Sequence, residues 1–274
     1  MPTLMAVHAH PDDEATSTGG VLARYADEGF TTIVVTCTNG ELGDLPGGVK
    51  PDTEGHDEEE VVRLRMQELK EACAILNVTH LELLGYRDSG MADWEHKGHA
   101  DAFCNVPVDA AADKLVALFD TYKPDVVVTY DPDSGYNHPD HIQASRVTMA
   151  AVERTGVPKK FYFTGQRTNR WARIRELLEE AGVELPPRPE PDAEMIKRME
   201  ALAAKVTTSV DVTAYAQRKM DALRVHVSQV GEMHWSSRLP PEAMTELWSE
   251  EHFVRVKDDT GAHVPEDDLF AGLR

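Results

Sequence analysis

The sequence predicts an α/β protein with a doubly wound, mostly parallel sheet flanked by helices. Three observations lead to this prediction. Short runs of apolar and β-branched residues recur along residues 1–165, and they alternate with longer segments in which apolar residues return with a helical period. The short runs are almost uniformly apolar, as in strands that are buried on both faces of a parallel sheet. Polar or glycine-rich segments follow several of these runs, at the edge of the sheet where such folds bind ligands.

The first half of this region contains three strands and two helices. Thr3–Val7 is a short apolar strand, and Gly20–Glu28 continues a first helix that ends near a glycine. Thr31–Thr38 is rich in β-branched residues, which is typical of a buried parallel strand. Apolar residues in Val61–Leu76 recur at helical spacing, and Leu81–Leu84 is the third strand.

The second half repeats the pattern. Pro107–Tyr122 is an amphipathic helix, and Asp125–Tyr130 is a fourth apolar strand. Asp140–Arg154 is the next helix, and Lys160–Thr164 is a fifth strand. Repeated strand–helix units of this kind build a doubly wound sheet with right-handed crossovers. We therefore expect residues 1–165 to form an α/β catalytic core.

For residues 166–274 the sequence predicts a C-terminal α+β extension that completes the fold and caps the pocket. Trp171–Ala181 and Ala193–Ala204 have the pattern of helices on either side of a proline-rich link. Val206–Val212 resembles a strand, and Tyr215–Val227 resembles a helix. The histidines of this region, His226 among them, have no ligand spacing, so we expect them at the surface or in packing contacts.

Histidines and carboxylates are concentrated in His8–Glu14, directly after the first strand. Such residues are unusual in a core, whereas imidazole nitrogen and carboxylate oxygen are the usual ligands of catalytic zinc. Pro11 fixes its own backbone angle and favours an extended His10, which holds the donors that follow in place. The alternative is a charged turn in which Asp12 or Asp13 caps the next helix.

A second segment with the same chemistry, Thr129–His141, ends the fourth strand and leads into a helix. Pro139 suits the first position of that helix, with Asn137 or His138 as the cap. His138 and His141 are three residues apart, so both can face the same side of the helix start.

The two segments should meet, because loops at the carboxyl ends of parallel strands open on the same edge of the sheet. One site can then collect His10, Asp13 and His141 as metal ligands, with Asp12 and His138 close by but not ligating. Catalytic zinc sites keep one coordination position open, so three protein ligands suffice.

A further group, His96, His99 and Cys104, suggests a second zinc site. It lacks a Cys-x-x-Cys pair, and we expect plain loop residues instead.

The pairing of His-Pro-Asp-Asp-Glu at 10–14 with His-Pro-Asp-His at 138–141 resembles the LmbE-like (PIG-L) family of zinc-dependent N-deacetylases. Within this family the chain is similar to the enzymes of mycothiol metabolism. The segments Arg65–Leu69 and Arg87–Met91 add to the resemblance, and Asp268–Gly272 adds to it faintly. The resemblance implies the Rossmann-like LmbE fold.

The resemblance also implies roles for the residues of the two motifs. It implies zinc, or iron(II) in the cell, held by His10, Asp13 and His141. It implies Asp12 as the general base, and His138 as the group that faces the developing oxyanion or the leaving amine.

Four other residues are candidates for the site. The resemblance implies that Arg65 and Asp88 contact sugar hydroxyls; from the residues alone, Arg65 is consistent with a surface ion-pair face and Asp88 with an Asx turn. Asp140 is a candidate partner that holds the protonation state of His138. Tyr136 is placed either to donate a hydrogen bond to the oxyanion or to anchor its loop.

The reaction that this set of residues supports is metal-assisted amide hydrolysis. The resemblance implies removal of an N-acetyl group from a small amino-sugar substrate of the N-acetylglucosaminyl-inositol type. The alternatives are a mycothiol S-conjugate amidase and a deacetylase of a secondary-metabolite glycoside. A metal-dependent sugar-binding protein without turnover is the non-enzymatic alternative, but such a protein has no use for the base and the acid that Asp12 and His138 supply.

Composition excludes several classes of partner. The chain has 48 Asp and Glu against 28 Lys and Arg, a formal net charge of −20, whereas proteins that bind nucleic acids carry a basic surface. No apolar segment is long enough for a membrane span or a signal peptide. The three cysteines are widely spaced, which favours reduced thiols in a cytoplasmic protein. A homo-oligomer is compatible with the sequence, which carries no specific signal for one.

Overall fold

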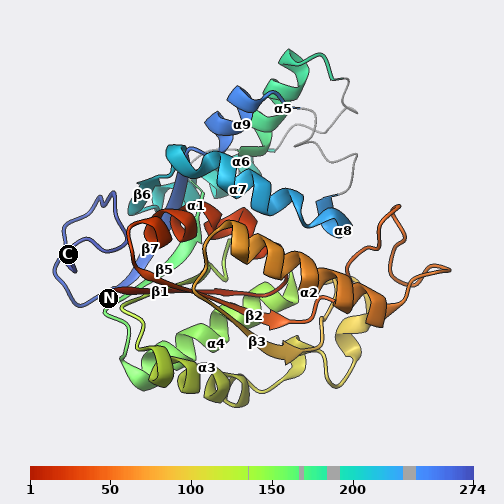
Figure 1. Ribbon diagram of the computed structural model, residues 1–274, viewed down its shortest axis with the longest axis horizontal. Coiled ribbons are helices and arrows are strands. Elements are labelled where there is room, and N and C mark those ends of the chain that lie inside the picture. The colour runs from red at the N-terminus through yellow and green to blue at the C-terminus, as the bar shows by residue number, and fades with distance from the viewer. Residues whose placement is uncertain (135, 167–169, 184–191, 231–238) are drawn as a thin grey trace.

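The structure of the protein is a computed structural model that describes residues 1–134, 136–166, 170–183, 192–230 and 239–274. Within these residues the chain forms a seven-stranded sheet in the order β3-β2-β1-β4-β5-β7-β6, with helices on both faces (Figure 1). The strands are β1 (Thr3–His8), β2 (Thr31–Thr38), β3 (His80–Tyr86), β4 (Val126–Tyr130), β5 (Lys160–Gly165), β6 (Thr208–Asp211) and β7 (Glu250–Asp258).

The strand order places β1 at the switch point of the sheet. Strands β1 to β5 run parallel to one another, and β7 pairs antiparallel with both β5 and β6. From β1 the chain winds outward to β2 and β3 on one side and to β4 and β5 on the other. Because the crossovers reverse direction there, the loops after β1 and β4 leave a crevice at their carboxyl ends, where such folds bind ligands.

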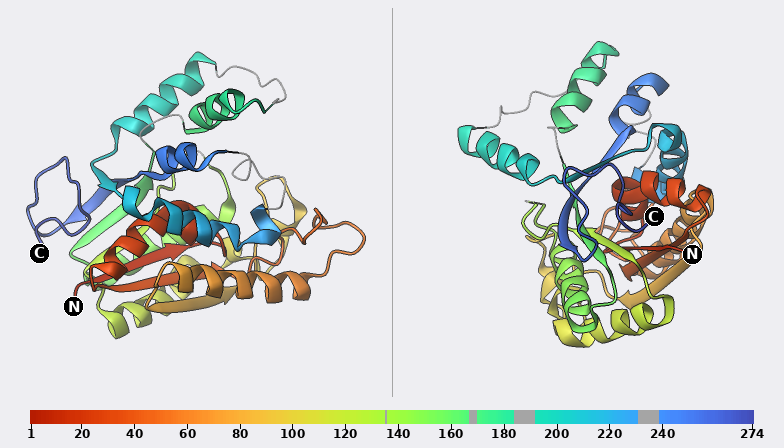
Figure 2. Two further views of the ribbon diagram at one scale, coloured as in Figure 1. Left: turned by 45° about the horizontal axis from the view of Figure 1, so that its top comes forward. Right: turned by 90° about the vertical axis from the view of Figure 1, so that its left-hand side faces the viewer.

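The helices form two layers around the sheet. The α-helices are α1 (Asp13–Asp27), α2 (Glu58–Ile75), α3 (Val108–Tyr122), α4 (Pro139–Thr155), α5 (Arg170–Glu180), α6 (Ala193–Ala204), α7 (Ala216–Arg224), α8 (Val227–Val230) and α9 (Pro241–Trp248). Three short 3₁₀ segments, η1 (Glu95–Gly98), η2 (Phe103–Asn105) and η3 (Thr213–Tyr215), lie in the connections. Helices α1, α2 and α7 cover one face, and α3 and α4 cover the other (Figures 1 and 2).

The core consists of two apolar clusters, one on each face of the sheet. Leu4 and Ala6 of β1 belong to the first cluster, and Met5 and Val7 of the same strand belong to the second. Successive side chains of a strand point to opposite faces, so β1 is buried on both sides. This explains why its sequence is an uninterrupted apolar run.

The predicted fold class is confirmed, and each of the five strands predicted in residues 1–165 is present. β2 has the predicted bounds, and the other elements of residues 1–165 differ at their ends by a few residues, apart from α1, which begins at Asp13. Among the described strands and α-helices, β7 and α9 were missed, and the short 3₁₀ segments were not predicted. In β7 charged residues interrupt the apolar ones, because the strand is antiparallel and only part of it is buried. The predicted helix over residues 215–227 is broken: α7 ends at Arg224 and α8 begins at Val227.

The residues beyond 165 extend the same sheet. β7 pairs along β5 from Lys160, opposite Asp258, to Gly165, opposite His252. The helices α5, α6 and α9 lie near this end of the sheet, at the top of Figure 1 and far from α3 (Figures 1 and 2). Within the described ranges no helix is both long and apolar enough to cross a bilayer.

A buried ion pair joins the C-terminal segment to β5. Lys160 and Glu266 have fully buried side chains and form a salt bridge. Glu266 also accepts hydrogen bonds from Tyr162 Oη at 2.9 Å, Thr208 Oγ1 at 2.8 Å and Arg255 Nη1 at 2.9 Å. A buried lysine that loses its carboxylate retains an uncompensated charge.

We therefore expect Glu266→Ala to lower the free energy of unfolding by about 3–5 kcal/mol, measured by urea denaturation. Asp120→Ala is the matched control, because its ion pair with Lys123 is largely exposed and should contribute less than about 1 kcal/mol. Equal midpoints for the two variants would contradict the stabilising role of the buried pair.

Candidate metal centre and active site

The first motif forms the turn between β1 and α1. β1 ends at His8, and α1 begins at Asp13. Asp13 folds back over the turn, where its Oδ2 accepts a hydrogen bond from the His10 N–H at 2.9 Å. Asp12 occupies the position before the helix, but within the described part of the chain its side chain accepts no capping hydrogen bond. The structure therefore does not support a helix cap as the role of this carboxylate.

The second motif forms the loop between β4 and α4. Helix α4 begins at Pro139, and His138 caps it: His138 Nδ1 accepts a hydrogen bond from the Asp140 N–H at 3.2 Å. The predicted cap at His138 is confirmed. Because β1 and β4 are neighbours in the sheet, the two loops lie side by side, as expected from the sequence.

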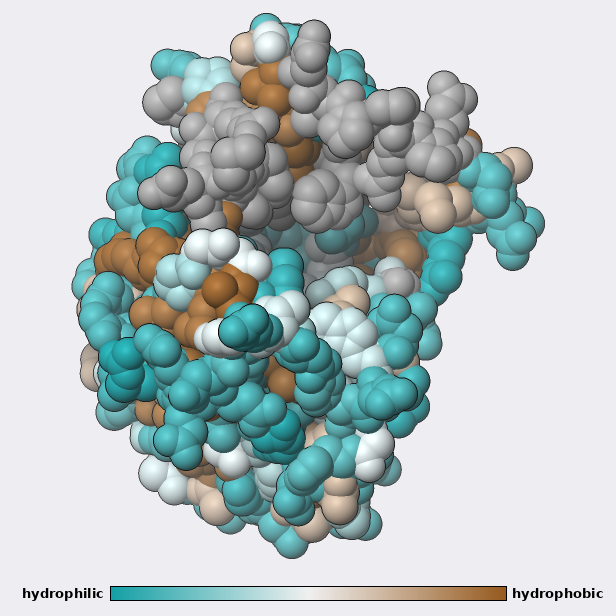
Figure 3. Space-filling view, turned by 90° about the vertical axis from the view of Figure 1, so that its right-hand side faces the viewer, coloured by the Kyte–Doolittle hydropathy of each residue, from teal (hydrophilic) through white to brown (hydrophobic). Residues whose placement is uncertain are grey.

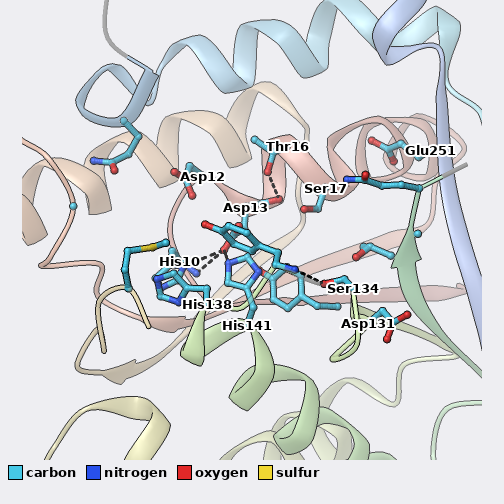
Figure 4. A pocket seen from close by; sticks show the side chains of 18 of the residues that line it. His10, Asp12, Asp13, Thr16, Ser17, Asp131, Ser134, His138, His141 and Glu251 are labelled. Atoms are coloured by element: carbon cyan, nitrogen blue, oxygen red, sulfur yellow. Dashed lines mark hydrogen bonds and ion pairs between the residues drawn. The ribbon is translucent and has the colours of Figure 1, made fainter. Parts of the chain in front are cut away.

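Three side chains converge between these loops. Asp13 Oδ2 lies 3.4 Å from His10 Nδ1 and 3.5 Å from His141 Nε2, and the donor atoms of all three lie within 4.8 Å of one another. Two ligands of one tetrahedral zinc ion are about 3.4 Å apart when each is about 2.0–2.2 Å from the ion. The donor set therefore fits a single metal ion. In Figure 4 the three side chains and His138 point toward one another, with Asp12 above them.

The protonation states of two of these side chains suit metal binding. Burial alone would raise the pKa of Asp13, but the adjacent His141 and His10 lower it well below its usual range. Burial and the neighbouring His10 lower the pKa of His141 to about 4, against the opposing effect of Asp13. An ionised carboxylate and a neutral imidazole are the forms that bind a metal.

His10 is held from its far side by carboxylates. Its Nε2 lies 3.2 Å from Asp140 Oδ2 and 3.7 Å from Asp88 Oδ1. Burial alone would lower the pKa of His10, but the surrounding carboxylates raise it well above its usual value. Asp140 in turn accepts a hydrogen bond from the Ser89 N–H at 2.9 Å. We expected the Asp140 carboxylate to hold the protonation state of His138, but it contacts His10 instead. A histidine that binds a metal commonly donates its other ring N–H to a carboxylate.

Asp88 forms a turn, which is one of the two roles that the sequence suggested for it. Its Oδ1 accepts a hydrogen bond from the Gly90 N–H at 2.8 Å, which is an Asx turn. The residue also lines the cleft in front of the site. The turn is thus confirmed, and the contact with a sugar hydroxyl stays a prediction.

Arg65 is buried beneath the first motif. Its guanidinium donates to Pro11 O at 2.6 Å and to Gly40 O at 2.8 Å, and its Nη2 lies 3.5 Å from Asp12 Oδ2. The surface ion-pair alternative is wrong, because the side chain is only 4 % exposed. Its hydrogen bonds in the structure are with the two loops, and its contact with a sugar stays a prediction.

Asp12 lies beside the three donors, and its Oδ2 is 3.5 Å from Nη2 of Arg65 (Figure 4). Burial raises the pKa of Asp12 to about 6, although Arg65 opposes the shift. Its side chain is 26 % exposed and lines the cleft. A carboxylate whose pKa is close to neutral pH is suited to accept a proton during a reaction.

His138 is neutral in the structure, whereas the sequence led us to expect an imidazolium that stabilises the oxyanion or protonates the leaving amine. Burial, His10 and His141 lower the pKa of His138 to about 3, so the imidazole is neutral rather than an imidazolium. Because its Nδ1 accepts from a backbone N–H, the neutral ring carries its proton on Nε2 and can donate from there. Tyr136 is exposed, and its ring lies edge-on to His141 with the centroids 4.9 Å apart. Both of the expected roles of Tyr136 stay predictions.

Two residues that support the site were not recognised in the sequence. Tyr130 stacks on His141 with ring centroids 4.0 Å apart, and its hydroxyl accepts from the Ala9 N–H at 2.8 Å. Glu14 is fully buried, and its Oε1 lies 2.7 Å from Nε2 of His226. Tyr130 ends a recognised strand next to the second motif, which is a weak signal. Glu14 gave no signal because its partner is 212 residues away.

A cleft of about 1670 Å³ opens in front of these residues. Figure 3 shows the face that carries the carboxyl ends of the strands, with many hydrophilic side chains and a hollow near its centre. Thr16, Ser17, Asp131 and Ser134 extend the wall of the cleft away from the site (Figure 4). Arg173, Leu202 and Glu246 line it from α5, α6 and α9. The cleft has room for a ligand larger than a single sugar ring.

The fold and the site together define a class of protein: a doubly wound α/β protein with a buried group of histidines and aspartates that can hold a metal ion at the switch point of its sheet. The family model of PIG-L, GlcNAc-PI de-N-acetylase, matches residues 5–152, which contain both motifs. The chain belongs to the PIG-L family, and it is an N-deacetylase of that family.

Full-length relatives are similar to the chain beyond the two motifs. A 1D-myo-inositol 2-acetamido-2-deoxy-α-D-glucopyranoside deacetylase of Actinosynnema mirum is 39 % identical over 99 % of this chain and 97 % of that protein. A mycothiol S-conjugate amidase of Streptomyces coelicolor is 33 % identical over 99 % and 97 %. Among solved structures, an N,N'-diacetylchitobiose deacetylase of Pyrococcus horikoshii aligns with a TM-score of 0.63 at 20 % identity, over 93 % of this chain and 83 % of that one. This last likeness supports the fold.

Proposed function

We propose that the protein removes the acetyl group from an N-acetylglucosaminyl glycoside of inositol, a small amino-sugar substrate in the cytoplasm. The observation that carries this proposal is the 39 % identity with an enzyme named for that substrate, which extends over nearly the whole of both chains. The identity includes the C-terminal part, which the family model does not cover. Relatedness over the whole chain favours a shared substrate more than relatedness of the motifs alone.

The proposed cofactor is zinc, with iron(II) as the alternative ion in the cell, held by His10, Asp13 and His141. Two imidazoles and one carboxylate form a donor set found in catalytic zinc sites, and the spacing of the donor atoms fits one ion. A metal bound there would polarise the amide carbonyl and make a water molecule more acidic.

The side chains around that position would carry out the proton transfers. Asp12 is proposed as the general base that takes a proton from the attacking water, because its carboxylate is not one of the proposed metal ligands and lines the cleft. His138 Nε2–H is proposed to donate a hydrogen bond to the developing oxyanion, for which a neutral imidazole suffices. Attack by water forms the new carbon–oxygen bond, and transfer of the proton from Asp12 to the nitrogen then accompanies cleavage of the carbon–nitrogen bond, which releases acetate and the free amine.

The outer parts of the cleft would select the substrate. We propose that Arg65, Asp88 and Tyr136 contact the sugar, because all three line the cleft beside the proposed metal ligands. We also propose that residues 166–274 complete the fold and cover the pocket, since α5, α6 and α9 each contribute a lining residue.

The test is acetate release from N-acetylglucosaminyl-inositol and from plain N-acetylglucosamine, with the metal content quantified and a chelated sample as control. We expect release that depends on metal and strongly prefers the inositol glycoside. Release of a cysteine conjugate from a mycothiol S-conjugate, without acetate release from the glycoside, would replace the proposed substrate with that of the related amidase. A protein that neither binds metal nor turns over either substrate would refute the proposed chemistry.

A further inference from the structure

Asp12 has an unusual backbone conformation. Its φ is 109° and its ψ is −25°, a region that residues with a side chain rarely adopt and that costs about 1–3 kcal/mol. A glycine would relieve this strain but would remove the carboxylate. Such a conformation persists only when its surroundings hold it in place, so the contacts that fix the Asp12 backbone are of interest.

Three contacts fix that backbone. Glu14 Oε2 accepts a hydrogen bond from the Asp12 N–H at 2.9 Å. Arg65 donates to Pro11 O at 2.6 Å, immediately before Asp12. The Thr16 N–H donates to Asp12 O at 3.2 Å. Of the side chains involved, Glu14 binds the peptide group of Asp12 itself.

Glu14 is held by a residue from the other end of the chain. Its side chain is fully buried, and its second carboxylate oxygen, Oε1, lies 2.7 Å from Nε2 of His226, which is also fully buried. The carboxylate therefore spans the distance between the two partners, with one oxygen on the Asp12 N–H and the other on the imidazole. A buried carboxylate with one contact on each oxygen has little freedom to rotate.

His226 is itself fixed by its position between two helices. It lies in the break between α7 and α8, and the backbone N–H groups of Gln229 and Val230 donate to its carbonyl oxygen at 2.9 and 2.8 Å. Ser228, two residues after His226, donates two hydrogen bonds to the carboxylate of Glu68 on α2, from its N–H at 2.9 Å and from its Oγ at 2.6 Å. The break in the predicted helix thus anchors the imidazole to the body of the protein.

We propose that Glu14 and His226 are positioning residues of the deacetylation reaction, which hold the Asp12 carboxylate in its strained conformation beside the scissile amide. The inference rests on the proposed role of Asp12 as the base. His226 is the cleaner probe of the two, because Glu14 adjoins the proposed ligand Asp13, whereas His226 reaches the site through Glu14.

The test is a double-mutant cycle between His226→Phe and Asp12→Asn. His226→Phe alone is expected to lower kcat by about 10–100-fold, with KM and bound metal close to the wild-type values, because displacement of a catalytic group by a fraction of an ångström is enough for such a loss. In the Asp12→Asn background the same substitution should change kcat by less than about twofold, because residues that act as one unit are not additive. An equal loss in both backgrounds, or loss of metal from His226→Phe, would overturn the inference.

Two further variants separate positioning from stability. His226→Gln places an amide N–H near the position of Nε2 and is expected to recover most of the lost kcat. Tyr162→Phe is the matched control. Tyr162 lies on β5 and does not line the cleft, and the substitution removes a buried hydrogen bond of 2.9 Å to Glu266; it should leave kcat unchanged. If Tyr162→Phe lowers kcat as much as His226→Phe, or His226→Gln is no better than His226→Phe, the role of His226 is structural.

A measurement without substrate keeps the inference distinct from the proposed function. Hydrogen exchange of the Asp12 backbone amide, followed by NMR, should be about 5–10-fold faster in Glu14→Ala and His226→Phe than in the wild type and Tyr162→Phe. Inactivity of the wild-type protein on every substrate would refute the proposed function but leave this result standing. Unchanged exchange of the Asp12 amide would refute the positioning contact, whatever the activity.

Discussion

Replacing His141 with alanine should yield a folded protein that does not retain a stoichiometric metal ion, and its deacetylase activity should fall to that of the chelated wild type. His141 supplies one of three donors, and its Nε2 lies 3.5 Å from Asp13 Oδ2. Loss of a residue that only orients a ligand weakens metal binding by about 10–100-fold, and loss of a ligand should cost more. Metal content after dialysis and acetate release are the two measurements.

His99→Ala is the control for this variant, because His99 is an exposed histidine of the segment considered for a second zinc site. It should retain the wild-type metal content. Full occupancy of His141→Ala would refute the proposed ligand set, and loss of metal from His99→Ala would indicate a second site. His10→Ala repeats the test at another donor, although that ring also contacts Asp140.

Asp12→Asn should lower kcat by about 10²–10⁴-fold, the usual contribution of a general base, with the metal retained. Asparagine has the shape of aspartate and tolerates positive φ better than most residues, so the substitution removes the charge with little change of conformation. The neighbouring variant Asp13→Asn is the matched comparison and should lose metal instead. Substitution of Asp12 would then lower kcat without loss of metal, and substitution of the adjacent Asp13 would lower the metal content.

Metal loss from Asp12→Asn would show that Asp12 is a ligand, and a kcat close to that of the wild type would remove it as the base. Circular dichroism of both variants controls for folding. The pair tests the division of roles between Asp12 and Asp13 more directly than either variant alone.

The sequence predicts the fold and the meeting of the two motifs because the signals are local. Runs such as Thr31–Thr38 are rich in β-branched residues and carry no charge, as expected of parallel strands that are buried on both faces. The motifs each lie within a few residues of a strand end, and the parallel arrangement brings them to the same edge. His10, Asp13 and His141 could therefore be grouped without a structure.

Other features depend on contacts that no short segment contains. The low pKa of His138 arises first from burial and then from His10 and His141, whose rings lie 4.4 and 5.4 Å away. The carboxylate of Asp140 contacts His10, and only its backbone N–H contacts His138, an arrangement that spacing along the chain does not reveal. β7 was missed because Glu251, an acidic residue, is buried in it: its carboxylate accepts from the Gly20 and Val21 N–H groups of α1.

The position of β7 in the sheet has a consequence for synthesis of the protein on the ribosome. β5 is complete long before β7, its antiparallel partner, emerges, so one edge of the parallel sheet stays open for several seconds at about 5–20 residues per second. An open strand edge can pair with another chain, and both histidine motifs are already present by then. Nascent chains that stall after β5 should therefore be the form of this protein most prone to aggregate and most in need of a chaperone.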